Sequence, residues 1–320
     1  MLAGTVVQYS REYIWVVLDD GGREVLAKPR GRIELEEQER ARRAEENLEP
    51  EKVVTQLVSV GDRVELTETE HGWFAIEAVL ERETWLLRKG NRRYRRKPQC
   101  IVANADQLAV VAAPNPVIRP STIDRFFLAA IQGGLTPLLL VNKIDVDPTL
   151  PDNPALRDYR ELGYQVFFLQ ATTGRGLDEL GGVLKDKFTV FCGHSGVGKS
   201  TILSRLTGVE IRTGEVKAKS LKGRQTTTSA RLYPLPGGGE VVDTPGIREF
   251  GLAHLTWLDV HEYFTRIAAL ATQCAFRDCT HTVEPDCAVR QAVQAGQLSA
   301  ERVKSYIKLR KETEDFKHWE

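Results

Sequence analysis

The first third of the chain alternates apolar and polar residues in short runs. These runs cover residues 2–9, 13–18, 23–29, 62–68 and 73–80, with glycine and aspartate turn signals between them. Alternation at period 2 with such short spacing predicts a five-stranded β-barrel like an OB-fold over residues 1–97. A stretch of mixed charge at residues 30–52 interrupts the pattern. It favours a solvated helix or loop, and the functional alternative is a loop that touches a large partner.

The pattern changes near Cys100, where continuous apolar runs begin to alternate with segments of helical character. This order is typical of a doubly wound parallel sheet, so we expect a central α/β domain over residues 98–252. Residues 253–320 are mostly helical in pattern and predict a third, mainly α-helical domain. The predicted strands of the central domain are residues 106–114, 136–141, 164–169 and 188–192, and its predicted helices are residues 121–134 and 152–162.

A glycine-rich loop follows the apolar run at residues 188–192. It fits the pattern G-x-x-x-x-G-K-[ST] between a predicted strand and a predicted helix, which is typical of a P-loop. In such loops backbone N–H groups surround phosphate oxygens, the lysine reaches the β- and γ-phosphates and the serine hydroxyl binds Mg²⁺. The residues predicted to bind the triphosphate are Gly193, His194, Ser195, Gly196, Val197, Gly198, Lys199, Ser200 and Thr201.

The nature of the base is indicated by Asn142-Lys143-Ile144-Asp145, which follows the apolar run 136–141. The Asp145 carboxylate can accept two N–H donors from guanine, which adenine does not offer in that arrangement. Asn142 and Lys143 are expected to brace the loop and pack along the base. Residues 170–172 are a weaker candidate for a further loop against guanine. GTP is therefore predicted, and the alternative of an ATP-using enzyme is opposed by Asp145.

Two further segments would sense the γ-phosphate. Asp243 and Gly246 fit a D-x-x-G element, in which the aspartate reaches Mg²⁺ through water and the glycine N–H meets the γ-phosphate. Residues 226–228 are three threonines, one of which can bind Mg²⁺ in the GTP state. The sequence does not distinguish among the three, and Thr228 is our choice.

The catalytic residues are expected beside the three threonines and in the P-loop. Ile247 stands where Ras-like enzymes carry a glutamine that orients the attacking water. Gln225 is the nearest residue with suitable chemistry, so we expect it to hold that water, with Lys199 as the second catalytic residue.

The order of the motifs differs from that of common GTPases, in which the P-loop comes first. Here the guanine motif at residue 142 precedes the P-loop at residue 193 and the D-x-x-G element at residue 243. The same sheet can form with this order of motifs if the original termini lay close together and were joined, and new termini arose in a loop. A circularly permuted GTPase domain is therefore predicted.

Four potential metal ligands crowd into the last third of the chain: Cys274, Cys279, His281 and Cys287. Three thiolates and one imidazole complete a tetrahedral structural Zn²⁺ site and leave no position for a catalytic water. The alternative is a set of separate thiols. Cys100 and Cys192 lie in apolar runs and are expected in the core.

Composition changes this picture only locally. The chain has 44 Lys and Arg against 44 Asp and Glu, so the overall charge indicates no partner. Residues 88–97 nevertheless hold seven cations and Tyr94, which favours contact with RNA over the alternative of a solvated linker. Trp15, Trp73 and Trp85 are expected in the core. No apolar run approaches the roughly 18 residues of a membrane span, so we expect a cytoplasmic protein without membrane contact.

The barrel, the permuted motifs and the Cys/His cluster together resemble the ribosome small subunit-dependent GTPases of the RsgA (YjeQ/YloQ) family. The resemblance covers essentially the whole chain and depends on GHSGVGKS, NKID, GRQTTT, DTPG and the four metal ligands. It implies an enzyme that converts GTP and water to GDP and phosphate when docked on the 30S subunit. It also implies a late role in maturation of that subunit and binding to 16S rRNA.

The expected cofactors are one structural Zn²⁺, and Mg²⁺ with GTP, in a monomeric protein. Family members often carry histidine where this chain has Gln225. The competing hypothesis is an RNA-binding assembly chaperone whose nucleotide site is only a weak sensor.

Overall fold

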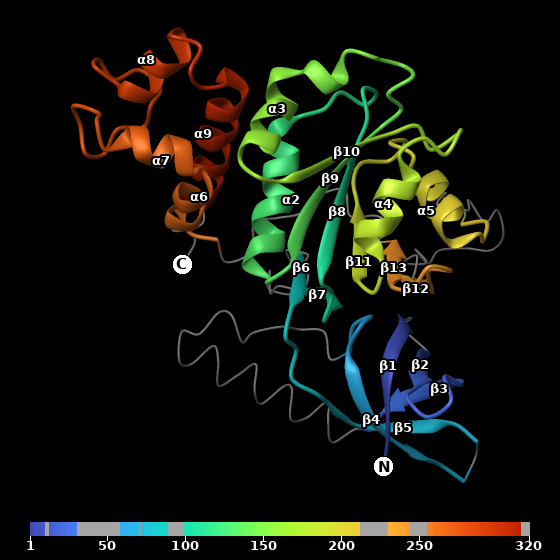
Figure 1. Ribbon diagram of the computed structural model, residues 1–320. Helices are drawn as coiled ribbons and strands as arrows, with labels where there is room; N and C mark the ends of the chain where they lie inside the picture. Colours follow the sequence, from blue (N-terminus) through green and yellow to red (C-terminus); the bar gives the residue numbers. More distant parts are fainter. Residues whose placement is uncertain are drawn as a thin grey trace, which may run out of the picture.

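The computed structural model describes residues 1–9, 13–30, 58–70, 72–88, 99–211, 230–243 and 255–314. Figure 1 shows a barrel at the amino-terminal end, a central sheet flanked by helices, and a group of carboxy-terminal helices beside α2 and α3. This three-part architecture confirms the predicted fold class.

The barrel forms because alternate residues of its strands point inward. Val6, Val16, Val64, Leu66 and Ile76 are fully buried and form its core. The strands follow the order β1-β2-β3-β5-β4, and β4 pairs with β1 to close the barrel. The five strands are β1 (Leu2–Tyr9), β2 (Ile14–Leu18), β3 (Glu24–Pro29), β4 (Arg63–Glu68) and β5 (Phe74–Val79).

A two-stranded hairpin, not predicted from the sequence, connects the barrel to the central domain. It consists of β6 (Trp85–Arg88) and β7 (Gln99–Ala103). The predicted domain boundary at residues 97 and 98 falls between these two strands. The cationic stretch, apart from Arg88, lies outside the described residues, as do residues 31–57.

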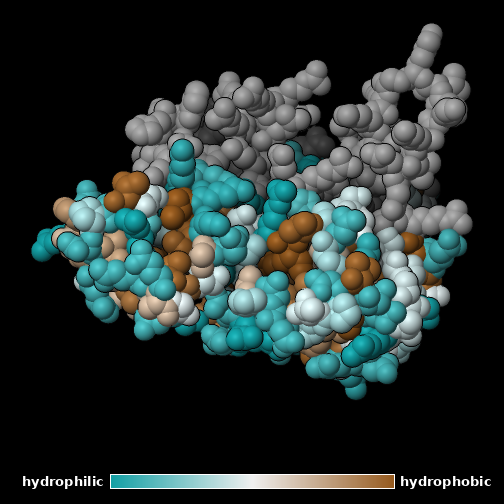
Figure 2. Space-filling model, turned by 90° about the horizontal axis from the view of Figure 1, so that it is seen from above, coloured by the Kyte–Doolittle hydropathy of each residue, from teal (hydrophilic) through white to brown (hydrophobic). Residues whose placement is uncertain are grey.

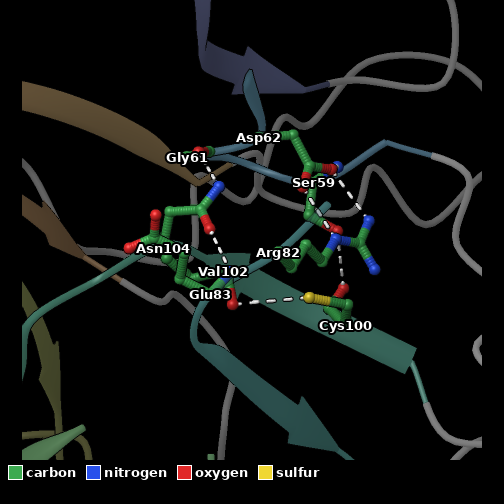
Figure 3. Close-up of polar contacts among 8 residues, drawn as sticks. All are labelled: Ser59, Gly61, Asp62, Arg82, Glu83, Cys100, Val102 and Asn104. Atoms are coloured by element: carbon green, nitrogen blue, oxygen red, sulfur yellow. Dashed lines mark hydrogen bonds and ion pairs between the residues drawn. The ribbon is translucent and has the colours of Figure 1, made fainter. Parts of the chain in front are cut away.

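Polar contacts hold the barrel against this hairpin and the residues that flank it (Figure 3), and the Ser59 hydroxyl donates to the Cys100 carbonyl of β7 at 3.2 Å. The buried Asp62 carboxylate accepts a hydrogen bond from the Ser59 backbone N–H at 2.6 Å and pairs with Arg82 at 2.7 and 2.8 Å. The Asn104 side chain donates to the Gly61 carbonyl at 3.0 Å. A Cβ on Gly61 would lie 2.0 Å from the Ala103 carbonyl oxygen, so the close approach requires glycine.

The central sheet has the order β10-β9-β8-β11-β13-β12, and all its neighbouring strands are parallel except β12 and β13. β12 also pairs with β1 of the barrel at Arg231 and Gln8, which makes the two sheets continuous. The strands are β8 (Gln107–Ala112), β9 (Thr136–Asn142), β10 (Gln165–Leu169), β11 (Phe188–Cys192), β12 (Arg231–Pro234) and β13 (Glu240–Asp243).

Helices cover both faces of this sheet, as expected for a doubly wound domain (Figure 1). Leu108 and Val110 of β8 pack with α2 and α3, whereas Ala109 and Val111 of the same strand belong to the core under α4 and α5. The helices are α2 (Pro120–Gln132), α3 (Pro154–Glu161), α4 (Leu177–Leu184) and α5 (Lys199–Thr207), with a short 3-10 turn η3 (Leu150–Asp152).

The carboxy-terminal helices pack against the central domain through a buried ionic network. Asp124 of α2 pairs with Arg302 and accepts hydrogen bonds from Ser305 at 2.5 Å and from Tyr159 and Tyr263 at 2.8 Å. Asp124 is fully buried, and Arg302 is 3% exposed. The four helices are α6 (Trp257–Tyr263), α7 (Thr265–Ala271), α8 (Ala288–Gln294) and α9 (Ala300–Glu314).

Trp15, Trp73 and Trp85 are half-buried, so the expectation that they are core residues is wrong. The surface is mixed in character. The face in Figure 2 is mainly hydrophilic, and its hydrophobic residues gather in separate patches. None of the described helices combines the length and the apolar character needed to cross a membrane.

Candidate nucleotide-binding site

The nucleotide motifs lie at the carboxyl ends of three parallel strands of the central sheet. Asn142 ends β9, Gly193 follows β11 and Asp243 ends β13. Because these strands run parallel in one sheet, their carboxyl ends share one edge, where open α/β sheets bind ligands. Segments that are far apart in the sequence therefore meet at one site.

Asn142 connects three loops of this site. Its side-chain oxygen accepts a hydrogen bond from the Ala171 backbone N–H at 3.1 Å, and its amide donates to the Val197 carbonyl at 2.9 Å. Asn142 is only 2% exposed, so both bonds are shielded from water. The guanine motif, the loop at residues 170–172 and the P-loop are thus joined by one side chain, and Lys143 adds a hydrogen bond to the Gly196 carbonyl at 2.5 Å.

The glycines of the P-loop are required by close contacts. Gly193 has φ +139°, and a Cβ there would lie 2.3 Å from the Val111 carbonyl oxygen. Gly198 has φ +96°, and a Cβ there would lie 2.3 Å from the Asn142 amide nitrogen. Helix α5 begins directly after Gly198, so its first N–H groups face the loop, an arrangement that suits phosphate.

Lys199 lies across the P-loop. Its ammonium donates to the Gly193 carbonyl at 2.8 Å and to the His194 carbonyl at 3.3 Å. His194, Ser195 and Gly196 are exposed, as a loop that receives a ligand requires. Thr201 is exposed and Ser200 is half-buried on the first turn of α5.

Two predicted site residues support the loops instead of facing a ligand with their side chains. Val197 is 2% exposed and belongs to the core under α4 and α5. Ile144 is 7% exposed, and its backbone N–H donates to the Leu169 carbonyl at 3.3 Å. Asp145, the next residue, is exposed, so the carboxylate predicted to recognise guanine is accessible.

Asp243 is 4% exposed and lies opposite Phe191 in the pairing of β13 with β11. The adjacent Cys192 is 1% exposed, and burial raises the pKa of its thiol, with Lys199 opposing this shift and Asp243 adding to it. Cys192 is therefore a neutral core residue, as predicted, and so is the fully buried Cys100, whose pKa burial also raises.

Gln225, Thr228 and Gly246 lie outside the described residues. Their roles in water positioning, Mg²⁺ binding and γ-phosphate sensing stay predictions.

One contact at this site carried no signal in the sequence. Arg205 of α5 donates to the Thr172 carbonyl at 2.6 Å and so ties the P-loop helix to the loop beside Asn142. The residue has no motif around it, and its partner is 33 residues away.

The four predicted metal ligands converge in the carboxy-terminal domain. The ligand atoms of Cys274, Cys279, His281 and Cys287 all lie within 4.8 Å of one another. The Cys274 and Cys287 sulfurs are 3.8 Å apart, and His281 Nδ1 is 3.4 Å from the Cys287 sulfur. Thiolates at about 2.3 Å from a shared tetrahedral centre would lie about 3.8 Å apart, so this cluster fits a metal ion.

The loop that carries this cluster is held by Glu284, which sequence reasoning missed. Its carboxylate accepts hydrogen bonds from the backbone N–H groups of Thr280, Thr282 and Val283 at 2.7 to 3.1 Å. The hydrogen bond from the Thr280 hydroxyl is the largest cause that lowers the pKa of Glu284, to about 2. Arg310 of α9 donates to the Cys279 carbonyl at 3.0 Å and fixes the other side of the loop.

Comparison with known proteins agrees with this geometry. A family model described as RsgA GTPase matches residues 79–253. The small ribosomal subunit biogenesis GTPase RsgA of Chlorobaculum tepidum is 43% identical over 262 residues, which cover 79% of this chain and 84% of the relative. The protein of the same name from Pseudomonas aeruginosa is 42% identical over 250 residues, which cover 77% of this chain and 73% of the relative.

Solved structures show the same arrangement. YjeQ from Thermotoga maritima matches with a TM-score of 0.68 and 31% identity, covering 98% of each chain. YloQ, described as a circularly permuted GTPase, has the same fold, with a TM-score of 0.65 at 23% identity over 99% of this chain and 96% of its own. The family model, the relatives and the solved structures agree, and the chain belongs to the RsgA GTPase family, with a circularly permuted GTPase domain.

Proposed function

We propose that this GTPase acts in the assembly of the small ribosomal subunit and hydrolyses GTP when it is docked there. The relatives at 42% and 43% identity are named small ribosomal subunit biogenesis GTPases. The observation that carries the nucleotide assignment is the Asn142 side chain, which joins the guanine motif to the P-loop at 2.9 Å. One nucleotide can therefore touch both.

The residues of the site divide the work of binding and hydrolysis. Asp145 accepts the guanine N–H donors, and the P-loop backbone surrounds the phosphates. The Lys199 ammonium donates to two loop carbonyls in this structure. With GTP bound, it would donate to the β- and γ-phosphates instead.

Oxygen donors for Mg²⁺ are present at the start of α5, on Ser200, and at the end of β13, on Asp243. The Ser200 hydroxyl and a hydroxyl of the threonine segment 226–228, assigned to Thr228, would be the direct oxygen ligands, and Asp243 would reach the ion through water. When bound, the ion neutralises the charge that develops on the phosphate oxygens.

Gln225 is assigned to hold the attacking water. An amide can orient water but cannot take its proton, so intrinsic hydrolysis should be slow and should accelerate when the subunit orders this segment. Gln225→Ala is expected to lower the stimulated turnover and to leave GTP affinity nearly unchanged. Single-turnover hydrolysis with and without subunits measures this, and an unchanged stimulated rate would remove Gln225 from the mechanism.

The Cys/His cluster is assigned to one structural Zn²⁺. Metal analysis of the purified protein should find one zinc per chain, and Cys287→Ser should lose it. Cys100→Ala is the matched control, because Cys100 is a buried thiol outside the cluster. A full zinc content in Cys287→Ser would contradict the assignment.

The partners follow from the same role: 16S rRNA in the small subunit, GTP and GDP, and no membrane, for a monomer in the cytoplasm. The decisive experiment is GTP turnover with purified small subunits, with large subunits as the control. Strong stimulation by small subunits alone is expected. Very slow turnover that does not respond to subunits, together with tight RNA binding, would favour the assembly chaperone instead.

Base specificity has its own test. Asp145→Asn should weaken GTP binding and favour xanthosine triphosphate, whose base has an oxygen in place of the exocyclic amine. An unchanged preference for guanine in a competition assay would show that the base pocket is misassigned.

A further inference from the structure

Helix α5 contacts two loops of the nucleotide site. Gly198 of the P-loop directly precedes the helix, and Arg205 lies in its last turn. At about 1.5 Å per residue, these two positions are about 10 Å apart along the helix axis. The Arg205 guanidinium donates to the Thr172 carbonyl at 2.6 Å. The helix that begins at the phosphate loop therefore also holds the loop at residues 170–174, which we name the base loop.

The base loop is a closed turn that is anchored to the guanine motif. The Gln170 carbonyl accepts hydrogen bonds from the N–H groups of Thr173 at 3.1 Å and Gly174 at 3.0 Å. The Ala171 N–H donates to the Asn142 side chain at 3.1 Å. Ala171 is 3% exposed, so this anchor lies in the core under α4 and α5.

Thr172 differs from its neighbours in this turn. The residue is exposed, and its N–H donates to no acceptor among the described residues. The neighbouring N–H groups of Ala171 and Thr173 are bonded, and Arg205 holds the Thr172 carbonyl. The Thr172 N–H is thus a backbone donor whose surroundings are set before a ligand arrives, which lowers the entropic cost of binding.

Guanine has an acceptor that the guanine motif does not satisfy. The exposed Asp145 carboxylate offers acceptors only, and it is assigned to the N–H donors of the base. Guanine also carries an exocyclic oxygen, where adenine carries an amino group. An N–H donor beside Asp145 would therefore bind guanine and reject adenine. The base loop is the segment that Asn142 joins to this motif.

We propose that Arg205 is a positioning residue for base recognition, which holds the base loop so that the Thr172 N–H donates to the exocyclic oxygen of guanine. A guanidinium suits this task, because it stays charged and its planar fork holds a carbonyl in a defined direction. The inference rests on the proposed nucleotide site, because that site supplies the guanine.

The test compares GDP with 6-thio-GDP, in which sulfur, a weak acceptor, replaces the exocyclic oxygen. Both nucleotides compete with a fluorescent GDP analogue for the full-length protein. The wild type should bind 6-thio-GDP about fivefold less tightly than GDP, the scale of one net hydrogen bond. Arg205→Ala should bind GDP about fivefold less tightly than the wild type does, and should bind the two nucleotides alike.

The ratio of the two dissociation constants separates positioning from a structural role. Both nucleotides are measured on the same variant, so a general loss of stability would change both affinities and not their ratio. Arg205→Lys, which keeps a charged donor, should recover part of the wild-type ratio. An undiminished ratio in Arg205→Ala, or a wild type that binds GDP and 6-thio-GDP alike, would overturn the proposal.

Arg160→Ala is the matched control for the loss of an exposed arginine. The Arg160 guanidinium also donates to a loop carbonyl at 2.6 Å, that of Pro151. Arg160 belongs to α3, which packs on the face of the sheet opposite to α5. GDP affinity and the ratio should both stay at their wild-type values. A ratio near one in this variant as well would show that the effect is not specific to Arg205, and would overturn the proposal.

ADP is titrated in parallel. If the wild type prefers GDP to ADP and Arg205→Ala keeps the wild-type ratio, only the positioning inference fails. If the wild type binds ADP as tightly as GDP, the proposed guanine site fails, and the positioning inference fails with it.

Discussion

Asn142 illustrates how much of the site depends on one amide. An asparagine side chain offers one acceptor and two donors, and here the oxygen and the nitrogen serve different loops. An aspartate of the same shape would place an oxygen against the Val197 carbonyl. The requirement is therefore for an amide and not only for a polar residue of this size.

We expect Asn142→Asp to lower both nucleotide affinity and stability. Leaving buried partners unsatisfied costs about 1–3 kcal/mol, which predicts a loss of roughly tenfold or more in GDP affinity. Titration with a fluorescent GDP analogue and a thermal melt measure the two effects.

Asn153→Ala is the control for this prediction. Asn153 caps α3 by accepting a hydrogen bond from the Ala155 N–H at 3.0 Å, far from the P-loop in sequence. The Asn153→Ala variant should lose about 1 kcal/mol of stability and keep its GDP affinity unchanged. Normal GDP affinity in Asn142→Asp would contradict the bridging role.

At this scale the sequence predicts motif residues well and supporting residues poorly. Asn142 and Lys199 are marked by their spacing. Glu284 and Arg205 have no such mark, because each acts on backbone groups that only the folded loops bring close.

Among the elements, α2 and α9 show how a buried charge can join two domains. The Arg302 guanidinium lies 4.7 Å from the ring centroids of Tyr159 and Phe264 while it pairs with Asp124. Both charges are removed from water, so neither is tolerable without the other.

Arg302→Met should therefore destabilise the protein by about 3–5 kcal/mol, because it leaves the Asp124 carboxylate buried without its cation. Chemical denaturation followed by circular dichroism measures this. Adding Asp124→Asn should recover part of the loss, since the uncompensated charge is then gone.

Arg266→Met tests whether the loss of an exposed ion pair between these domains destabilises the protein as much as Arg302→Met. Arg266 pairs with Asp158 at 3.3 Å and Glu161 at 3.1 Å, but 41% of its side chain is exposed. A loss below about 1 kcal/mol is expected. Equal losses for both arginines would show that burial is not the cause.

The strands of the barrel could be predicted almost to the residue. One face of each strand is buried, so apolar and polar residues alternate along its sequence. The hairpin of β6 and β7 could not, since β6 has only four residues and pairs across a cationic stretch. The burial of Arg302 was also hidden, because its partner Asp124 is 178 residues away.

For the whole molecule, the junction in Figure 3 fixes where the barrel sits. Gly61 contacts Ala103 and Phe188, the latter at the start of β11, whereas the nucleotide site lies at the other end of that strand. Barrel docking and nucleotide binding are therefore at opposite ends of the central sheet.

Gly61→Ala should disturb docking and spare nucleotide binding. A Cβ at Gly61 would lie 2.0 Å from a carbonyl oxygen and 2.7 Å from the Phe188 ring. We expect a lower melting temperature and weaker stimulation by subunits, with unchanged GDP affinity.

Gly72→Ala is the control, because Gly72 has φ +76° but nothing within 4 Å of its Cβ position. Gly72→Ala introduces the backbone strain of a positive φ without the clash, so it should lower the melting temperature less than Gly61→Ala does. If the two variants behaved alike, the close approach at the junction would have no energetic role.

The position of β11 has a consequence for how the chain is made. β11 lies between β8 and β13, yet it is synthesised after β8, β9 and β10. A nascent chain that has emerged only as far as β10 presents an unpaired edge of β8, a surface open to wrong partners. The P-loop directly follows β11, so nucleotide can be captured only after this strand has been inserted beside β8.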